Sequence, residues 1–250
     1  MGLNVVFGIE IKENIKPQEK SEIYSAMACI DFIFGTILEK NKLDFKGLHI
    51  AEIVFMDKIF SDKVFVMEKH ELKREGIAGY YKTEVQINCK NFKSLSNYEK
   101  KKETLKLLMN GIRRIVEYQG WDKTPFEDTN SKISETDYIC EWKRNKPQQL
   151  AKHNSKKLKA GIGVIRDIGK LDEYFVFICD SRQKELYRET IFSDEFGRFG
   201  NFLNKHIRNT RYWPLEINWD NENKIIITNL VGHPPKWIVT VPNDIITKNL

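Results

Sequence analysis

The sequence has only four cysteines, and none of them forms a C-x-x-C pair. Cys29, Cys89, Cys140 and Cys179 are far apart in the chain, whereas a zinc site or a disulfide framework needs closer, patterned spacing. The five histidines show no H-x-x-x-H or H-E-x-x-H spacing, and no serine lies in a G-x-S-x-G turn. The sequence therefore predicts four reduced, mostly buried thiols, no bound metal, no cofactor and no assignable catalytic residue.

Long apolar runs are absent as well. The longest, around residues 26–38, is interrupted by Asp31 and falls short of the roughly 20 residues that cross a bilayer. Glu10 and Lys12 follow too soon after the first residue for a secretory signal. Gly161-Ile162-Gly163 lacks the third glycine and the helix start of a dinucleotide-binding loop. These observations predict a cytoplasmic protein with no membrane partner.

The first half of the chain has no net charge, and the whole net positive charge lies in the second half. Residues 1–140 contain 22 Lys and Arg against 22 Asp and Glu, whereas residues 141–250 contain 19 against 13, a net charge of +6. Hydrophobic residues make up 41% of the chain and charged residues 30%, which is ordinary for a folded protein. The composition therefore predicts a globular chain whose second half carries the excess charge.

The apolar periodicity predicts an α+β protein. In the first half we expect the order β-α-β-β-β-α, with an antiparallel sheet covered on one face by two long helices. Ser96 and Glu99 fit a capping box at the start of the second helix, and Gly120 is suited to end it. The expected strands cover residues 5–11, 49–56, 63–67 and 80–89, and the expected helices cover 17–40 and 96–119.

The second half is predicted to be mostly antiparallel β with one or two helices. One helix is expected over 196–207, with Ser193 as a candidate cap. Residues 122–136 are polar and rich in turn-forming types, which predicts a connection between the halves. We therefore expect an α+β domain over 1–121, a connecting and basic segment over 122–160, and a β-rich domain over 161–250. Its expected strands cover 138–142, 174–179, 185–191, 215–219, 224–230 and 236–241.

One pattern bears on catalysis. Glu141-Trp142-Lys143 on an expected strand, preceded by Asp122, Asp128 and Asp137, resembles the Asp…Glu-x-Lys signature of a large nuclease superfamily. That resemblance implies a Mg²⁺ ion held by carboxylates and a lysine that orients water. The alternative is a surface ion pair between Glu141 and Lys143, which a chain this rich in charge often produces.

The strongest candidate binding feature is the basic segment 143–159, which contains no acidic residue. It could bind the phosphates of a nucleic acid, with Trp142 stacking on bases, or an acidic protein surface, or serve only as a solvated connection. Clustered aromatic residues and a histidine in a Pro-rich loop supply further candidate anchors. The candidate partner-binding residues are Trp142, Lys143, Arg144, Lys146, Lys152, Lys156, Lys157, Lys159, Tyr212, Trp213, His233 and Trp237.

The strand 80–89, the following loop Lys90-Asn91-Phe92-Lys93-Ser94-Leu95-Ser96 and the helix to Gln119 resemble the immunity proteins of bacterial polymorphic toxins. That resemblance implies a non-enzymatic cytoplasmic protein that occludes a cognate toxin, and it assigns no individual residue. The basic charge favours a toxin with an acidic surface. The alternatives are a Mg²⁺-dependent nuclease with a Glu-x-Lys site and a non-catalytic nucleic-acid-binding protein.

Overall fold

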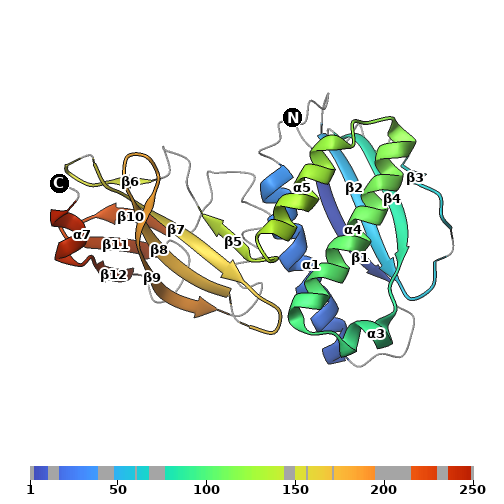
Figure 1. Ribbon diagram of the computed structural model, residues 1–250, viewed down its shortest axis with the longest axis horizontal. Coiled ribbons are helices and arrows are strands. Elements are labelled where there is room, and N and C mark those ends of the chain that lie inside the picture. Colours follow the sequence, from blue (N-terminus) through green and yellow to red (C-terminus); the bar gives the residue numbers. More distant parts are fainter. Residues whose placement is uncertain are drawn as a thin grey trace. The chain divides into compact units, whose positions relative to one another are not determined.

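The computed structural model in Figure 1 describes residues 3–10, 17–38, 48–59, 61–67, 77–143, 150–155, 157–170, 172–194, 215–229 and 236–248. The chain divides into two compact units. Met1–Cys140 and Asp167–Gly169 belong to the first unit, and Glu141–Arg166 and Lys170–Leu250 belong to the second. Both units contain strands and helices, and the predicted α+β class is confirmed.

The first unit contains a four-stranded sheet in the order β1-β2-β4-β3. Its strands are β1 (Leu3–Glu10), β2 (Leu48–Met56), β3 (Phe65–Val66) and β4 (Ile77–Gln86). Both β1 and β4 run parallel to β2, and only β3 is antiparallel to its neighbour. The expected antiparallel sheet is therefore wrong. Alternation of apolar residues indicates which face of a strand is buried, but it is equally compatible with either strand direction.

Two long helices cover this sheet, as predicted. Helix α1 (Pro17–Leu38) packs against β1, and α4 (Asn97–Gln119) packs against β2 and β4. The capping box at the start of α4 is confirmed, because Ser96 Oγ accepts a hydrogen bond from Glu99 N and the Glu99 carboxylate accepts one from Ser96 N. Gly120 ends the helix with φ of 64°, a left-handed conformation that glycine adopts without strain.

Helix α1 is more apolar than expected from the apolar run at residues 26–38. Over Lys20–Leu38 it is long and apolar enough to match a membrane-spanning helix, although half of that segment is buried inside the protein. Its buried residues, among them Ala26, Cys29 and Ile30, lie in the core of the first unit. The helix contacts α4 and α5 as well as β1, which explains why it is apolar on more than one side.

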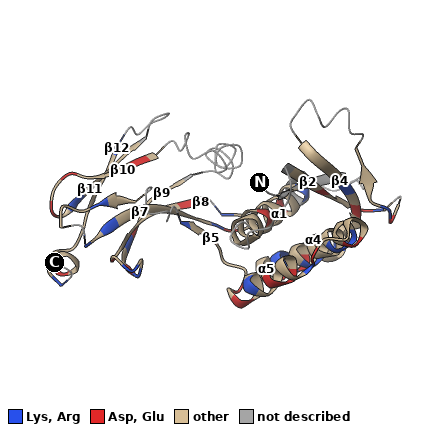
Figure 2. Cartoon of the chain, turned by 90° about the horizontal axis from the view of Figure 1, so that it is seen from above, with Lys and Arg blue, Asp and Glu red and all other residues tan. Residues whose placement is uncertain are grey.

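The segment expected to be a polar connection is instead a helix. Helix α5 (Thr124–Glu135) buries Phe126, Thr129 and Ile133 and contacts α1 and α4, so residues 122–136 are part of the first unit's packing. Pro125 stands in the first turn, where proline is compatible with a helix. Residues of the expected loop 90–96 also form a helix, α3 (Cys89–Ser94), which Asn88 caps. In Figure 2 the helices lie on one side of β2 and β4.

A short second stretch of chain completes the first unit. Ile168 is only 2% exposed and belongs to the same apolar core as α1 and α4. Its carbonyl accepts a hydrogen bond from Asn97 Nδ2 at 3.0 Å, and Lys101 Nζ lies 2.6 Å from the carboxylate of Asp167. The first unit is therefore built from two separate parts of the sequence.

The second unit consists of two sheets and a short helix, α7 (Asn243–Thr247). The larger sheet has the order β5-β7-β8-β9, with β6 also paired to β7, and the smaller has the order β10-β11-β12. The pairs β6–β7, β7–β8, β8–β9, β10–β11 and β11–β12 are antiparallel, as predicted. The strands are β5 (Cys140–Lys143), β6 (Ala151–Lys152), β7 (Lys159–Arg166), β8 (Asp172–Cys179), β9 (Glu185–Asp194), β10 (Leu215–Trp219), β11 (Lys224–Asn229) and β12 (Lys236–Thr240).

Both sheets of the second unit have buried apolar side chains. Ile162, Val176 and Ile225 are fully buried, and β10 contacts both β6 and β7. The predicted central strand 174–179 is confirmed, since β8 pairs with a strand on each side. Ser193 lies within β9 opposite Glu173, so its expected role as a helix cap is wrong. The helix expected over 196–207 lies outside the described residues.

A candidate partner-binding surface and the charge network beside it

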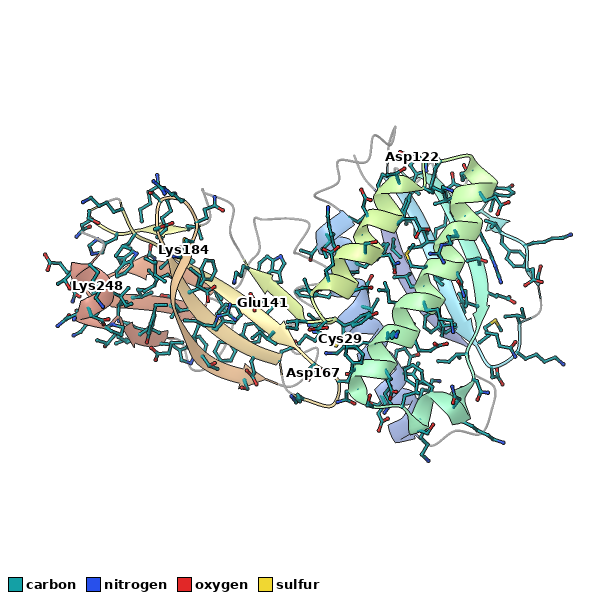
Figure 3. The ribbon with its side chains drawn as sticks, in the orientation of Figure 1. Cys29, Asp122, Glu141, Asp167, Lys184 and Lys248 are labelled. Atoms are coloured by element: carbon teal, nitrogen blue, oxygen red, sulfur yellow. The ribbon has the colours of Figure 1, made fainter. Side chains whose placement is uncertain are left out.

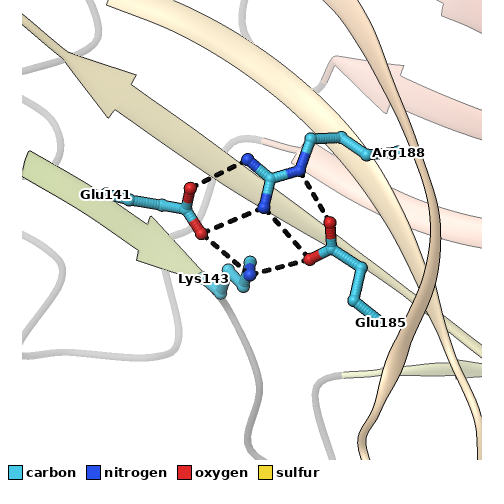
Figure 4. A network of polar contacts seen from close by, with 4 residues as sticks. All are labelled: Glu141, Lys143, Glu185 and Arg188. Carbon is cyan, nitrogen blue, oxygen red and sulfur yellow. Dashed lines mark hydrogen bonds and ion pairs between the residues drawn. The ribbon is translucent and has the colours of Figure 1, made fainter. Parts of the chain in front are cut away.

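Glu141 and Lys143 on β5 meet Glu185 and Arg188 on β9 in a closed network of opposite charges (Figure 4). Arg188 donates to Glu141 from Nη1 at 2.8 Å and Nη2 at 3.1 Å, and to Glu185 from Nε at 2.8 Å and Nη2 at 3.1 Å. Lys143 Nζ lies 2.8 Å from Glu141 and 2.7 Å from Glu185. Each carboxylate is thus bound by both cations, and the four charges sum to zero.

Two aromatic rings lie beneath the cations. The Arg188 guanidinium is 4.1 Å from the centre of the Phe175 ring, and Lys143 Nζ is 5.7 Å from that of Phe177. Cations over aromatic faces gain electrostatic attraction in addition to their ion pairs. The two rings, both on β8, are buried at 1% and 3% exposure, so they support the network from the interior side.

The rings fit because β7 has glycine opposite each of them. Phe175 pairs with Gly163 and Phe177 with Gly161, and a Cβ atom on either glycine would lie only 2.2 or 2.4 Å from a ring carbon. The Gly161-Ile162-Gly163 stretch that fails as a dinucleotide loop is therefore part of a strand. Its two glycines leave room for aromatic side chains of the neighbouring strand.

The network determines what Glu141 and Glu185 can do chemically. Burial alone raises the pKa of each carboxyl, but hydrogen bonds from Arg188 and Lys143 together outweigh it, and both pKa values lie below the ordinary range. A Mg²⁺ ion at Glu141 would have to displace these two cations. Across the described ranges, no group of three His, Cys, Asp or Glu side chains converges as metal ligands would.

The carboxylates proposed to pair with Glu141 have other surroundings. Asp122, labelled in Figure 3, accepts a hydrogen bond from the Thr124 backbone amide at the start of α5. Asp128 is exposed on α5, and Asp137 is exposed in the turn that follows that helix. Glu141 and Lys143 thus form the ion pair that was the alternative to a nuclease site.

Replacing Arg188 with methionine is expected to lower the unfolding free energy by about 1–2 kcal/mol at neutral pH, because two adjacent carboxylates then share only Lys143. Since the folded-state pKa values of Glu141 and Glu185 are lowered, this stabilisation is present above their ordinary value of 4.5 and is lost as the pH falls through the lowered values. Urea unfolding at pH 7, 5.5, 4 and 3 measures both effects.

The matched control for Arg188 is Lys184→Met, which removes one positive charge from the exposed turn before β9 (Lys184 is labelled in Figure 3). This variant is expected to stay within about 0.5 kcal/mol of the wild type at every pH. The difference in unfolding free energy between the wild type and Arg188→Met should become smaller between pH 5.5 and pH 3. If it does not, the stabilising role of the network is contradicted.

The basic segment 143–159 does not act as one surface. Lys143 is held in the network, whereas Lys152, Lys157 and Lys159 lie on the β6–β7 hairpin, described over residues 151–155 and 157–160, which we call the basic hairpin. Lys152 and Lys157 are exposed and Lys159 is half-buried. Lys152 pairs directly with Lys159 across the hairpin. The remaining candidates of this segment, Arg144, Lys146 and Lys156, lie outside the described residues.

A buried histidine and a half-buried tryptophan hold the basic hairpin in place. His153 is 3% exposed, and its Nδ1 accepts a hydrogen bond from the Ser155 backbone amide at 3.1 Å. Nε2 donates to the Glu222 carbonyl at 3.0 Å, since a carbonyl oxygen can only accept. Trp219 Nε1 donates to the Ala151 carbonyl, and its ring packs edge-on against His153. Both contacts join the hairpin to the β10–β11 region.

The aromatic candidates belong partly to the interior. Trp237 stacks on Phe192 with ring centres 4.5 Å apart, so it packs between β12 and β9. Trp142 is half-buried on β5. Tyr212, Trp213 and His233 lie outside the described residues. The described aromatic candidates therefore offer less exposed surface for a partner than the lysines of the basic hairpin do.

A shallow hollow lies next to the charge network. It is lined by Lys143, Leu150, Phe177, Cys179, Gln183 and Glu185, and its volume of about 190 Å³ is below the range typical of ligand pockets. Burial raises the pKa of the Cys179 thiol, which keeps it protonated at neutral pH and weakly nucleophilic. The hollow thus offers neither an activated nucleophile nor an unpaired acid among its lining residues.

Comparison with known proteins identifies no relative. No protein-family model matches the chain, and neither a curated protein nor a solved structure matches it. The anchors of the basic hairpin, His153 and Trp219, were not found from the sequence, because their hydrogen-bond partners are 69 and 68 positions away and no local spacing marks them.

Proposed function

We propose that this chain is a non-enzymatic, cytoplasmic protein-binding module, an immunity-type inhibitor that occludes a cognate bacterial toxin with an acidic surface. The observation that carries the proposal is the basic hairpin. It presents Lys152 and Lys157 to solvent on a β-hairpin that is held in place by hydrogen bonds of buried His153 and half-buried Trp219. The arrangement at Glu141, by contrast, is saturated by ion pairs.

A charged hairpin that hydrogen bonds hold in place suits a binding function. A surface that is already ordered loses less conformational entropy on association, so more of the contact energy appears as affinity. Exposed positive charge accelerates encounter with an acidic partner and disfavours partners of like charge. A toxin inhibitor benefits from both properties because it must bind rapidly and remain bound.

Co-expression with the product of the adjacent upstream gene tests the proposal. If that gene encodes a toxin, the tagged chain is expected to co-purify with it at about 1:1 and to restore growth of cells that express the toxin. Lys152→Glu/Lys157→Glu is expected to weaken the complex by roughly tenfold or more without lowering the melting temperature, because the glutamate introduced at position 152 would stand opposite Lys159. The same substitutions at Lys58 and Lys90, which are exposed in the first unit, serve as the control.

Two outcomes would overturn the proposed function. One is the absence of a toxin gene together with the absence of a specific protein partner in native-host pull-downs. The other is Mg²⁺-dependent cleavage of DNA or RNA by the wild type that Glu141→Ala abolishes, which would establish the nuclease alternative. Salt-sensitive binding of DNA or RNA without cleavage would favour the nucleic-acid-binding alternative.

A further inference from the structure

Two exposed regions of opposite charge lie side by side in the second unit. One is the basic hairpin with Lys152, Lys157 and Lys159. The other is the turn between β10 and β11, residues 220–223, where Asp220 and Glu222 are both exposed. We call this second region the acidic turn. In Figure 1 β6 lies beside β10, and contacts between these strands agree with that placement.

Hydrogen bonds connect the basic hairpin to the acidic turn. His153 Nε2 donates to the backbone carbonyl of Glu222, and Trp219, next to the acidic turn, donates to the carbonyl of Ala151 on the hairpin. The turn is itself ordered, because Asp220 N donates to the Lys224 carbonyl and Asn223 N donates to the Asn221 side chain. Both charged regions are therefore parts of one hydrogen-bonded surface.

Four of the charges on this surface, those of Lys152, Lys159, Asp220 and Glu222, have no ion-pair partner among the described residues. Lys152 and Lys159 stand directly opposite each other, an arrangement of like charges that costs folding energy. Such a pair gains stability when an anionic group of a partner approaches both lysines.

We propose that the basic hairpin and the acidic turn form a bipolar docking surface for a protein partner. The partner would place carboxylates against Lys152 and Lys159 and a basic side chain against Asp220 and Glu222. This inference deepens the proposed function and rests on it for the kind of partner. In this proposal both the lysines and the carboxylates of the surface contact the partner. The partner can therefore bind in only one orientation, with its acidic part on the basic hairpin and its basic part on the acidic turn.

A nucleic acid fits this surface less well. A phosphate backbone that follows the hairpin would meet the two carboxylates of the acidic turn, which repel it. Trp219, the aromatic side chain between the two regions, already uses its indole N–H for Ala151 and packs its ring against His153. Its ring is thus already in contact with the protein, which makes stacking of a base on it less favourable.

Three probes test the proposal in fluorescence anisotropy at 50 mM NaCl. The first is a 24-residue peptide with a glutamate block followed by a lysine block, the second is an all-glutamate peptide of the same length, and the third is a 20-base-pair DNA duplex. The wild type is expected to bind the bipolar peptide about fivefold more tightly than the all-glutamate peptide, and more tightly than the duplex.

Charge-reversal variants then separate the two regions. Lys152→Glu/Lys159→Glu is expected to weaken binding of both peptides by about tenfold. Asp220→Lys/Glu222→Lys is expected to invert the order, so that the all-glutamate peptide binds more tightly than the bipolar one. Lys58→Glu/Lys90→Glu makes the same charge change as the hairpin variant on the first unit, and it should leave the order unchanged. Circular dichroism verifies that each variant is folded.

Any one of three results would overturn the inference. The wild type could bind the duplex more tightly than either peptide, it could bind the two peptides equally well, or the acidic-turn variant could leave the order of the two peptide affinities unchanged. The peptide assay does not use the toxin, so its failure is distinguishable from that of the proposed function. A captured toxin with a negative peptide result refutes only the bipolar surface. An inverted peptide order without any toxin refutes only the inhibitor role.

Discussion

Replacing Arg166 with methionine is expected to lower the unfolding free energy of the second unit by about 3–5 kcal/mol. Arg166 and Asp172 are only 2% and 1% exposed, and their bidentate contact has N–O distances of 3.0 and 2.8 Å. Without the guanidinium, the Asp172 carboxylate remains buried with its principal charged partner missing. Urea unfolding followed by tryptophan fluorescence at pH 7 measures the loss.

The double variant Arg166→Met/Asp172→Leu distinguishes the effect of an unpaired buried charge from the effect of lost side-chain packing. Because it removes both charges and keeps apolar volume, it is expected to recover most of the stability lost in the single variant. Arg182→Met, an exposed arginine on the β8–β9 turn, should change stability by less than about 0.5 kcal/mol. A single-variant cost no larger than that of Arg182→Met would show that the buried pair is not important for folding.

Gly163→Val is expected to destabilise the protein by about 2–3 kcal/mol, although valine has the higher strand propensity. A Cβ at this position would lie 2.2 Å from Cζ of the Phe175 ring, and that ring supports the Arg188 guanidinium. The ring must therefore shift, which disturbs both the buried face of β8 and the charge network. Thermal unfolding by circular dichroism measures the effect.

Gly35→Ala is the control, a glycine substitution that is expected to raise stability and not lower it. Gly35 lies within α1, and an added Cβ has no other atom within 4 Å, so alanine is expected to stabilise the helix by up to about 1 kcal/mol. Gly163→Val/Phe175→Ala should be less destabilised than the sum of its single variants, since the smaller side chain removes the clash. Additive costs would contradict the role of the glycine in making room for the ring.

The sequence predicted best those elements whose signals are local. The start and end of α4 followed from Ser96, Glu99 and Gly120, because capping involves residues three or four positions apart. Helix α5 was missed because it is short and polar on its outer side, and only Phe126 and Ile133 indicate its buried face. Strand β7 was missed because Gly161 and Gly163 lower strand propensity, and their fit depends on rings of another strand.

The candidate site was predictable in composition and not in geometry. The excess of lysine over 143–159 was visible, and three of those lysines are on one hairpin. The separate role of Lys143 was not visible, because its network includes Arg188, which is 47 positions from Glu141. The acidic turn was not identified either, since its position beside the hairpin depends on the packing of β10 against β6.

The two-part construction of the first unit has a consequence for synthesis on the ribosome. Ile168, which belongs to that unit's core, is translated after β5, β6 and β7 of the second unit. The first unit therefore cannot acquire its complete core when residue 140 leaves the exit tunnel, and final consolidation must wait for the turn at 167–169. A nascent chain halted before this turn lacks both Ile168 and the Asp167 partner of Lys101.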